Sequence, residues 1–354
     1  MNKKKLIVIP LLLFLIICVS FLGISIYMLS PVDSKNEILV EFNIENGTGK
    51  SKIVEELKKK DLIRSIFFGK VLVKLKNVEL YAGTYKLSKD LSTNEILNKI
   101  SNQDNIENET ITITFVEGKR LNYFISEISK NFGYSEDEIN ELLNDKDYLD
   151  GLIEKYWFIT DSIYNEEIYT PLEGYLYPDT YEFKKSSTIK EIIEKLLNNM
   201  DNKLSDYKDD IETGTFSVHE YLTLASIVEL EGVNSADRAG VAGVFYNRLN
   251  SGMTLGSDVT TYYAVGKDFS RELTNNDLNS CNGYNTRGTC VKGLPVGPIC
   301  NAGLSSLAAA IEPEENKYYY FVADKNKKTY FSTTALEHAE TVSKLKSDGL
   351  WYTY

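Results

Sequence analysis

The segment SVHEYLTLASIVELEG, residues 217–232, constrains the fold more than any other part of the chain. Ser217 followed by Glu220 is the capping-box pattern that begins helices, and Gly232 is typical of a helix end. The apolar residues between them recur at helical spacing and predict one buried stripe, made of Val218, Tyr221, Leu222, Ala225 and Val228. We therefore expect a helix packed into a domain core.

Two glutamates close this predicted helix and differ in their position around it. Glu229 falls on the apolar stripe, whereas Glu231 points to roughly the opposite side. Burial disfavours the charged form of a carboxyl, and a carboxyl that keeps its proton near neutral pH can act as a general acid on a sugar oxygen. The alternative for Glu229 is structural, since such a residue also pairs with an arginine or caps a neighbouring helix.

Composition limits the class of protein. The 354 residues allow two or three domains, and 43% hydrophobic content with 12% aromatics indicates real cores. A net charge of −12 argues against nucleic-acid binding, which needs a basic face. No zinc-type spacing, phosphate-binding loop or metalloprotease motif occurs, so we expect neither metal nor cofactor. Cys281 and Cys290 bracket a Gly-rich loop and can pair in an oxidising compartment, with free thiols as the alternative.

The amino-terminal end predicts a membrane anchor. Residues 1–5 are basic, and residues 6–29 are almost wholly apolar, where a spanning helix needs about 20 such residues. The positive-inside rule makes residues 1–5 a cytoplasmic tail and places the rest outside the cell. A cleaved signal peptide has a shorter apolar core of about 7–15 residues. A lipoprotein wants small residues before its cysteine, whereas the residues before Cys18 are large.

The remainder predicts a linker and two folded parts. Residues 30–36 form the linker, and residues 37–108 follow the order strand, helix, helix, strand, helix. The order β-α-α-β resembles the small peptidoglycan-binding module LysM, although many small α/β units share it. In residues 109–354 we expect a strand at 110–115, a series of capped helices, a loop-rich stretch after Gly252 and two late strands. The expected fold class is α+β: a transmembrane helix, a LysM-like module and a mixed α+β catalytic domain.

Several blocks of the second part resemble a known family. They are, in order, EGKRL, LEGYLYPDTYEF, LASIVELEG, AGVFYNRLNSGMTLGSDVTTYY, YNTRGTCVKGLPVGPICNAG and SLAAAIEPEENKYYYFVADKNKKTYFSTT. Together they resemble the endolytic murein transglycosylase family, also called MltG or YceG-like. With the amino-terminal anchor the resemblance covers nearly the whole chain, so residues 109–354 are expected to be a YceG-like catalytic domain.

The resemblance implies a function. Members are single-pass membrane enzymes that face the cell wall and act in its assembly. They cleave between N-acetylmuramic acid and N-acetylglucosamine inside glycan strands and leave 1,6-anhydro ends. The first Glu of the family's V-E-x-E pattern is catalytic, and here it is Glu229. The implied partners are peptidoglycan glycan strands, the membrane and peptidoglycan synthases, without nucleic acid.

Polar loop residues are candidates to hold the distorted sugar ring. They are Ser257, Asp258, Tyr284, Asn285, Thr286 and Asn301. For each, bracing of a turn is the alternative role, and Asp258 is also a candidate second carboxylate, which would allow hydrolysis. A muramidase-type hydrolase and a non-catalytic wall-binding scaffold therefore stay open as alternative functions. The chain departs from the family pattern at Leu230, Gly256, Val259, Val296 and Ala302.

Overall fold

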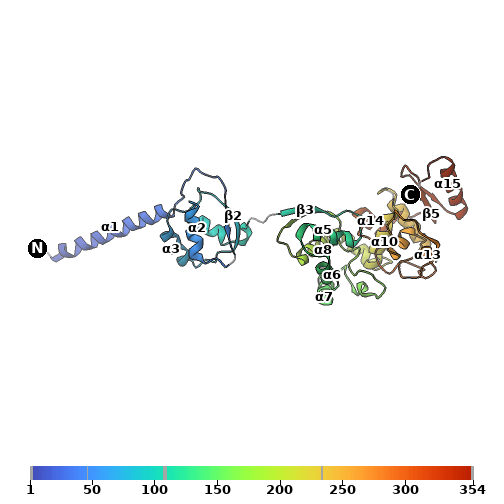
Figure 1. Ribbon diagram of the computed structural model, residues 1–354, viewed down its shortest axis with the longest axis horizontal. Coiled ribbons are helices and arrows are strands. Elements are labelled where there is room, and N and C mark those ends of the chain that lie inside the picture. The colour runs from blue at the N-terminus through green and yellow to red at the C-terminus, as the bar shows by residue number, and fades with distance from the viewer. Residues whose placement is uncertain (1–2, 46, 107–109, 233, 352–354) are drawn as a thin grey trace. The chain divides into compact units, whose positions relative to one another are not determined.

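The computed structural model describes residues 3–45, 47–106, 110–232 and 234–351, with side chains described from Leu12 onward except at Leu13 and Asp104. The chain divides into two compact units, residues 1–109 and 110–354 (Figure 1). Each unit has its own buried apolar cluster. The mixed α+β character expected from the sequence is confirmed.

The amino-terminal unit is built around a two-stranded antiparallel sheet. Strand β1 (Val40–Ile44) pairs with β2 (Gly83–Leu87), and the inward side chains Phe42, Ile44, Tyr85 and Leu87 are buried. Between and after the strands lie α2 (Lys50–Lys59), α3 (Ile66–Lys76), α4 (Thr93–Ile100) and the short η1 (Gln103–Asn105). The order β1-α2-α3-β2 is the one expected from the sequence.

Helix α1 (Lys3–Leu29) begins this unit. One prediction about this helix is corrected. Within the part of the chain that the structure describes, no helix is long and apolar enough to cross a membrane. The expected transmembrane helix at residues 6–29 is therefore not supported. The side chains of the expected cytoplasmic tail, residues 1–5, lie outside the described residues.

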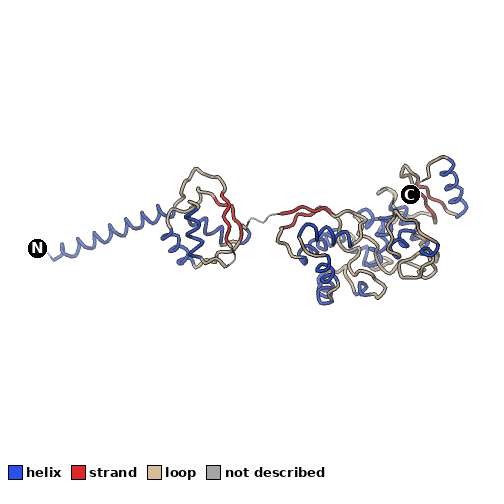
Figure 2. Tube along the Cα trace, viewed as in Figure 1, coloured by secondary structure: helices blue, strands red, loops and turns tan. Residues whose placement is uncertain are grey.

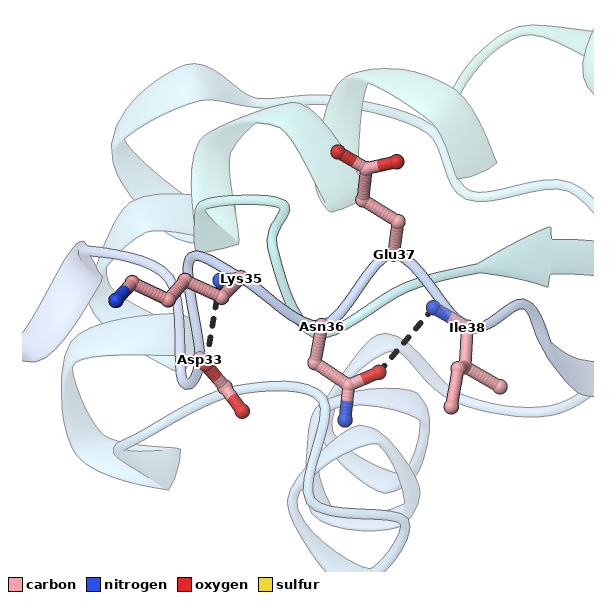
Figure 3. A pocket seen from close by; sticks show the side chains of 5 residues that line it. All are labelled: Asp33, Lys35, Asn36, Glu37 and Ile38. Atoms are coloured by element: carbon pink, nitrogen blue, oxygen red, sulfur yellow. Dashed lines mark hydrogen bonds between the residues drawn. The ribbon is translucent and has the colours of Figure 1, made fainter.

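The segment expected as a linker forms an ordered loop that lines a pocket. Asp33, Lys35, Asn36, Glu37 and Ile38 surround it (Figure 3). Two short turns hold the loop: Asp33 accepts a hydrogen bond from the Lys35 amide, and Asn36 from the Ile38 amide, each at 3.2 Å. Because neighbouring residues of one loop supply the whole lining, we assign this pocket no function.

The carboxy-terminal unit is mostly helical, with two further hairpin-like sheets (Figure 2). Strand β3 (Thr110–Thr114) pairs with β4 (Thr180–Lys184), and β5 (Tyr320–Ala323) pairs with β6 (Thr329–Ser332), both antiparallel. Its helices are α5 (Leu121–Phe132), α6 (Glu136–Leu143), α7 (Lys146–Lys155), η2 (Asp161–Tyr164), α8 (Ile189–Ser205), α9 (Lys208–Thr213), α10 (Val218–Glu231), α11 (Arg238–Asn250), α12 (Asp258–Ala264), α13 (Asn275–Leu278), α14 (Leu304–Ile311) and α15 (Ala335–Ser347).

The capping boxes that mark helix starts in the sequence are present. Ser217 accepts from the Glu220 amide, and the Glu220 carboxylate accepts in return from the Ser217 amide at 2.8 Å. The same reciprocal pairs open α4, α6 and α8. Helix α11 begins at Arg238, and Asn234 braces the preceding turn by accepting from the Asp237 amide at 3.0 Å.

Helix α10 is buried on all sides, which the single apolar stripe did not predict. The stripe itself is buried as expected, but so are His219, Thr223, Leu224, Ser226 and Ile227. Helices α9, α11, α12 and α14 pack around it. The small polar side chains tolerate burial because they bond locally: Thr223 donates to the His219 carbonyl and Ser226 to the Thr223 carbonyl, each at 2.7 Å.

Candidate functional site

Glu229 lies in the last turn of α10, where three other groups converge on its carboxylate. Its side chain is 6% exposed. Oε1 accepts from Nη2 of Arg238 at 2.7 Å, and Oε2 accepts from the Ser306 hydroxyl at 2.7 Å and from the Gly303 amide at 3.1 Å. Gly303 is the N-cap of α14, so Glu229 both pairs with an arginine and binds a helix amino terminus. All three contacts donate a hydrogen bond to the Glu229 side chain.

Arg238 holds Glu229 from the first turn of α11. Its Nη1 also donates to the Ser305 hydroxyl, so the guanidinium ties α11 to both α10 and α14. A Cβ on Gly232 would lie 2.8 Å from Cγ of Arg238, and the absence of a side chain at this helix end makes room for the arginine. From the sequence, an arginine was expected only as one of two structural partners for Glu229, and Arg238 itself was not identified.

The turn after β3 approaches the same carboxylate from another direction. Gly118 adopts a φ of +73°, and a Cβ on it would lie 3.9 Å from Oε1 of Glu229. The Gly118 amide donates to the Asn301 carbonyl, and the Asn301 amide donates to the Lys119 carbonyl, both at 2.9 Å. These bonds join the turn to the segment that leads into α14.

Glu117 in this turn is the site residue that sequence reasoning missed. A Cβ on Gly303 would lie 2.1 Å from Oε1 of Glu117, so the Glu117 carboxyl rests directly against Gly303. The same glycine donates its amide to Glu229. The EGKRL block carried the signal, but only as a match to a family and without a role for its glutamate.

Glu231 points away from Glu229, as the helical spacing predicted, and the side on which it lies is enclosed. Its Oε1 accepts from the Ser257 hydroxyl at 2.6 Å. Burial raises the pKa of the Glu231 carboxyl, and the hydrogen bond from Ser257 partly offsets this. Because α10 is enclosed on every side, its two terminal glutamates lie in two separate polar clusters.

Two of the six predicted substrate-binding residues belong to the Glu231 cluster. Ser257 is buried and donates its hydroxyl hydrogen bond to Glu231. Asp258 is exposed and forms an ion pair with Arg287 at 2.8 Å. Gly256 before them has a φ of +60° and donates its amide to the Thr286 carbonyl, which accounts for glycine at this departure from the family pattern. The structure thus brings Asp258 toward Glu231 and does not pair it with Glu229.

The other four candidates are buried and make bracing contacts. The Asn285 amide group donates to the Asp277, Leu278 and Ser280 carbonyls. The Asn301 side chain accepts from the Leu176 amide at 3.0 Å. Thr286 accepts from the Ser257 amide at 3.1 Å, and Tyr284 packs on Tyr169 and Tyr263. In the absence of substrate these residues hold loops in place, and their role in sugar binding stays a prediction.

Glu173, from the LEGYLYPDTYEF block, is a third enclosed carboxyl. Its oxygens accept from the Leu121 amide at 2.9 and 3.1 Å, from Asn301 at 3.3 Å and from the Tyr263 hydroxyl at 3.4 Å. Burial raises the pKa of Glu173 to about 7, against these donors and the Arg120 charge. Glu173 thereby ties the start of α5 to the Asn301 segment beside the site.

The raised pKa of Glu173 predicts that the free energy of unfolding depends on pH. The folded protein holds the Glu173 proton to about pH 7, whereas the unfolded chain releases it near 4.5. The stabilising contribution is therefore complete below about pH 4.5 and is lost as the pH rises to about 7, at about 1.4 kcal/mol per unit. We expect Glu173→Gln to remove this slope. Urea unfolding of both proteins from pH 4.5 to 8 tests it, and a wild-type-minus-variant difference that is independent of pH would contradict it.

A disulfide closes the loop that carries three of the predicted residues. Cys281 and Cys290 are bonded, which resolves the alternative left by the sequence. The loop contains Tyr284, Asn285 and Thr286. Cys18 and Cys300 are free, and Cys300 is fully buried. Among the described residues, no three His, Cys, Asp or Glu side chains gather as a metal site requires.

The disulfide gives a second testable expectation. Native protein denatured without reductant should show two free thiols, from Cys18 and Cys300. Replacing Cys281 and Cys290 together by Ser should lower the free energy of unfolding by about 2–3 kcal/mol, because the unfolded loop is no longer closed. Activity should fall as the Thr286–Ser257 contact loosens. Four free thiols in the untreated protein would show that the bridge does not form.

The fold and site define a class: an α+β protein in which an enclosed glutamate, Glu229, is held by an arginine and a helix amino terminus. The model of the YceG-like family matches residues 42–344. The chain is 36% identical over 320 residues to the endolytic murein transglycosylase of Bacillus subtilis (strain 168), covering 90% of this chain and 88% of that protein. This chain belongs to the YceG-like family.

Two further comparisons agree. The endolytic murein transglycosylase of Streptococcus pneumoniae serotype 2 (strain D39) is 31% identical over 337 residues, which cover 89% of this chain but 60% of that protein. A crystal structure of a yceG-like protein from Listeria monocytogenes superposes with a TM-score of 0.61 at 33% identity, covering 86% of this chain and 99% of that one. The family resemblance read from the sequence is thereby confirmed.

Proposed function

We propose that this chain is an endolytic peptidoglycan lytic transglycosylase that cleaves the N-acetylmuramic acid–N-acetylglucosamine bond and leaves 1,6-anhydro ends. The observation that carries the proposal is the enclosed Glu229 carboxylate, at the position where the family places its catalytic glutamate. The relatives named endolytic murein transglycosylase supply the substrate class and the reaction type.

Glu229 serves both halves of the reaction. Its carboxyl first donates a proton to the glycosidic oxygen as the bond to the anomeric carbon breaks. The carboxylate then takes the proton of the C6 hydroxyl as that oxygen bonds the anomeric carbon, so the enzyme is restored and no water is consumed. The nucleophile belongs to the sugar itself, and proximity replaces a positioned water. Arg238, Ser306 and the Gly303 amide fix the carboxylate and stabilise its charged form between the two steps.

The compartment, the role of the amino-terminal unit and the protein partners are proposed from this activity. We place the carboxy-terminal unit outside the cytoplasm, where its substrate lies, and the Cys281–Cys290 disulfide supports an oxidising compartment. The amino-terminal unit is proposed to hold glycan strands, on the basis of its LysM-like element order. Peptidoglycan synthases are the proposed partners, since they make the strands that this enzyme would cut.

Product analysis tests the reaction. Purified glycan strands digested with the full chain should yield new 1,6-anhydro-muramic ends by mass spectrometry, with internal cuts that shorten long strands early. New reducing ends would instead identify a muramidase-type hydrolase, and uncut strands bound by the protein would identify a scaffold. Either of these results would overturn the proposal.

A further inference from the structure

We propose that Glu117 is a second catalytic carboxyl, which faces the sugar ring beside Glu229 and stabilises the positive charge that develops at the anomeric carbon. This rests on the proposed glycosidic cleavage and adds a residue to it.

The first observation is the shared contact with Gly303. The Glu229 carboxylate accepts from the Gly303 amide at 3.1 Å, and the Glu117 carboxyl occupies the place where a side chain at 303 would begin. A Cβ there would lie 2.1 Å from Oε1 and 2.6 Å from Oε2 of Glu117. Because both carboxyls touch one residue, a sugar that presents its glycosidic oxygen to Glu229 also lies next to Glu117.

The second observation is that Glu117 lacks donors. In the part of the chain that the structure describes, no group donates a hydrogen bond to its carboxyl or pairs with it. Glu229, Glu173 and Glu231 each have at least one donor. The two neighbouring carboxyls repel each other when both are charged, and no protein donor offsets this at Glu117.

The third observation is the rigidity and exposure of its position. The backbone bonds between Gly118, Lys119 and Asn301 fix the turn that carries Glu117. Glu117 is exposed, whereas the Glu229 side chain is 6% exposed. Glu117 is thus the open member of the pair, and its free oxygens are available to a ligand.

The chemistry requires a negative group at such a place. Cleavage of a glycosidic bond passes through an oxocarbenium-like state with positive charge on the sugar ring. The Glu229 charge is engaged by Arg238 and α14, whereas the Glu117 charge has no protein partner. A preorganised, uncompensated carboxylate stabilises a developing cation more than it stabilises the neutral substrate.

The charges around Glu117 determine when it is ionised. Although Glu117 as a residue is exposed, packing of its carboxyl against Gly303 removes part of the surrounding water and raises its pKa. The charges of Glu229 on α10 and Asp179 before β4 raise this pKa further, and Arg238 on α11 lowers it. Tyr177 also faces it and has a pKa raised to about 12, so it is neutral over the working range. The rate should consequently fall on the acid side, above the usual range of a glutamate, as Glu117 takes up a proton.

Steady-state kinetics of Glu117→Gln, Glu117→Asp and the control Glu127→Gln on purified strands from pH 4 to 8 test this. Glu127 lies on α5, where its charge faces Lys130. We expect Glu117→Gln to lower kcat about 10²-fold with little change in KM or melting temperature, and to lose the acid limb. Glu117→Asp should recover part of kcat and keep the limb, and Glu127→Gln should match wild type.

The outcomes separate this inference from the proposed function. Wild-type kcat in Glu117→Gln at every pH, or a loss confined to KM, would overturn the role of Glu117 and leave the transglycosylase intact. If Glu117→Gln unfolds, a folded Glu117→Asp protein with reduced kcat and a retained acid limb supports the role of the carboxylate, whereas Glu117→Asp with full kcat or without the acid limb overturns it. Absence of anhydro ends from the wild-type protein would instead remove the reaction itself.

Discussion

Replacing Glu229 by Gln is expected to lower the rate of anhydro-end formation by about 10⁴-fold. General acid–base catalysis contributes about 10²–10⁴-fold, and here one carboxyl acts in both half-steps. Glutamine keeps the shape of the side chain but removes the transferable proton. Digestion of purified glycan strands and counting of anhydro-muramic ends by mass spectrometry measure the loss. Substantial activity in a folded Glu229→Gln protein would show that Glu229 is not the acid.

The control for this experiment lies on the same helix. Glu220→Gln makes the same chemical change at the start of α10, where Gln also completes a capping box. Its activity should equal that of wild type. The activity of Glu231→Gln should lie between those of wild type and Glu229→Gln, because Glu231 holds Ser257 beside a predicted substrate loop.

Glu229→Gln itself should lose about 1–2 kcal/mol of stability, since its amide cannot accept from both Arg238 and the Gly303–Ser306 pair. Thermal melting of each variant separates this loss from the catalytic one.

The sequence predicted local structure well where the interacting residues lie within one helical turn of each other. The capping boxes at Ser92, Ser135, Thr188 and Ser217 are all present, because each depends on two residues that are close in the chain. The strand limits of β3, β5 and β6 follow the same logic of short alternating runs. The position of Glu229 at the end of a core helix was also visible, since helical spacing alone places it on the stripe.

The partners of Glu229 could not be read in this way. Gly303 and Ser306 lie far along the chain from α10, and their bonds depend on how α14 packs against it. The stripe placed Glu231 on another side of the helix from Glu229, and Glu231 does lie in a separate cluster, but the burial of that side follows from the four helices packed around α10. Glu117 was not identified because the EGKRL block gives it no role, and its place in the site depends on a contact far along the chain: Gly303 has no side chain, and that space holds the Glu117 carboxyl. Spacing within one element cannot reveal such a contact.

The membrane prediction failed for a different reason. The prediction rested on a run of apolar residues at 6–29 that satisfied the length rule for a membrane span. Helix α1 does form, yet the described residues contain no span long and apolar enough. The helix was predicted correctly, whereas its assignment as a transmembrane helix is not supported.

The second large effect concerns Arg238, whose replacement by Met should destabilise the fold by about 3–5 kcal/mol. The side chains of Arg238 and Glu229 are 12% and 6% exposed, and removing one partner leaves the other as an uncompensated buried charge. Methionine fills a similar volume beside Gly232 without replacing the donor. We expect denaturant unfolding to show this loss together with strongly reduced activity.

A double-variant cycle shows whether the destabilisation comes from the ion pair. Glu229→Gln in the Arg238→Met background removes the stranded charge, so the double variant should be more stable than Arg238→Met alone, by at least about 1 kcal/mol. The amide still accepts from the Ser306 hydroxyl or the Gly303 amide. Activity should not return, because the proton donor is gone. If the two losses of stability simply add, Arg238 would act through its packing on Gly232 and Ser305, and the site would not depend on its charge to hold Glu229.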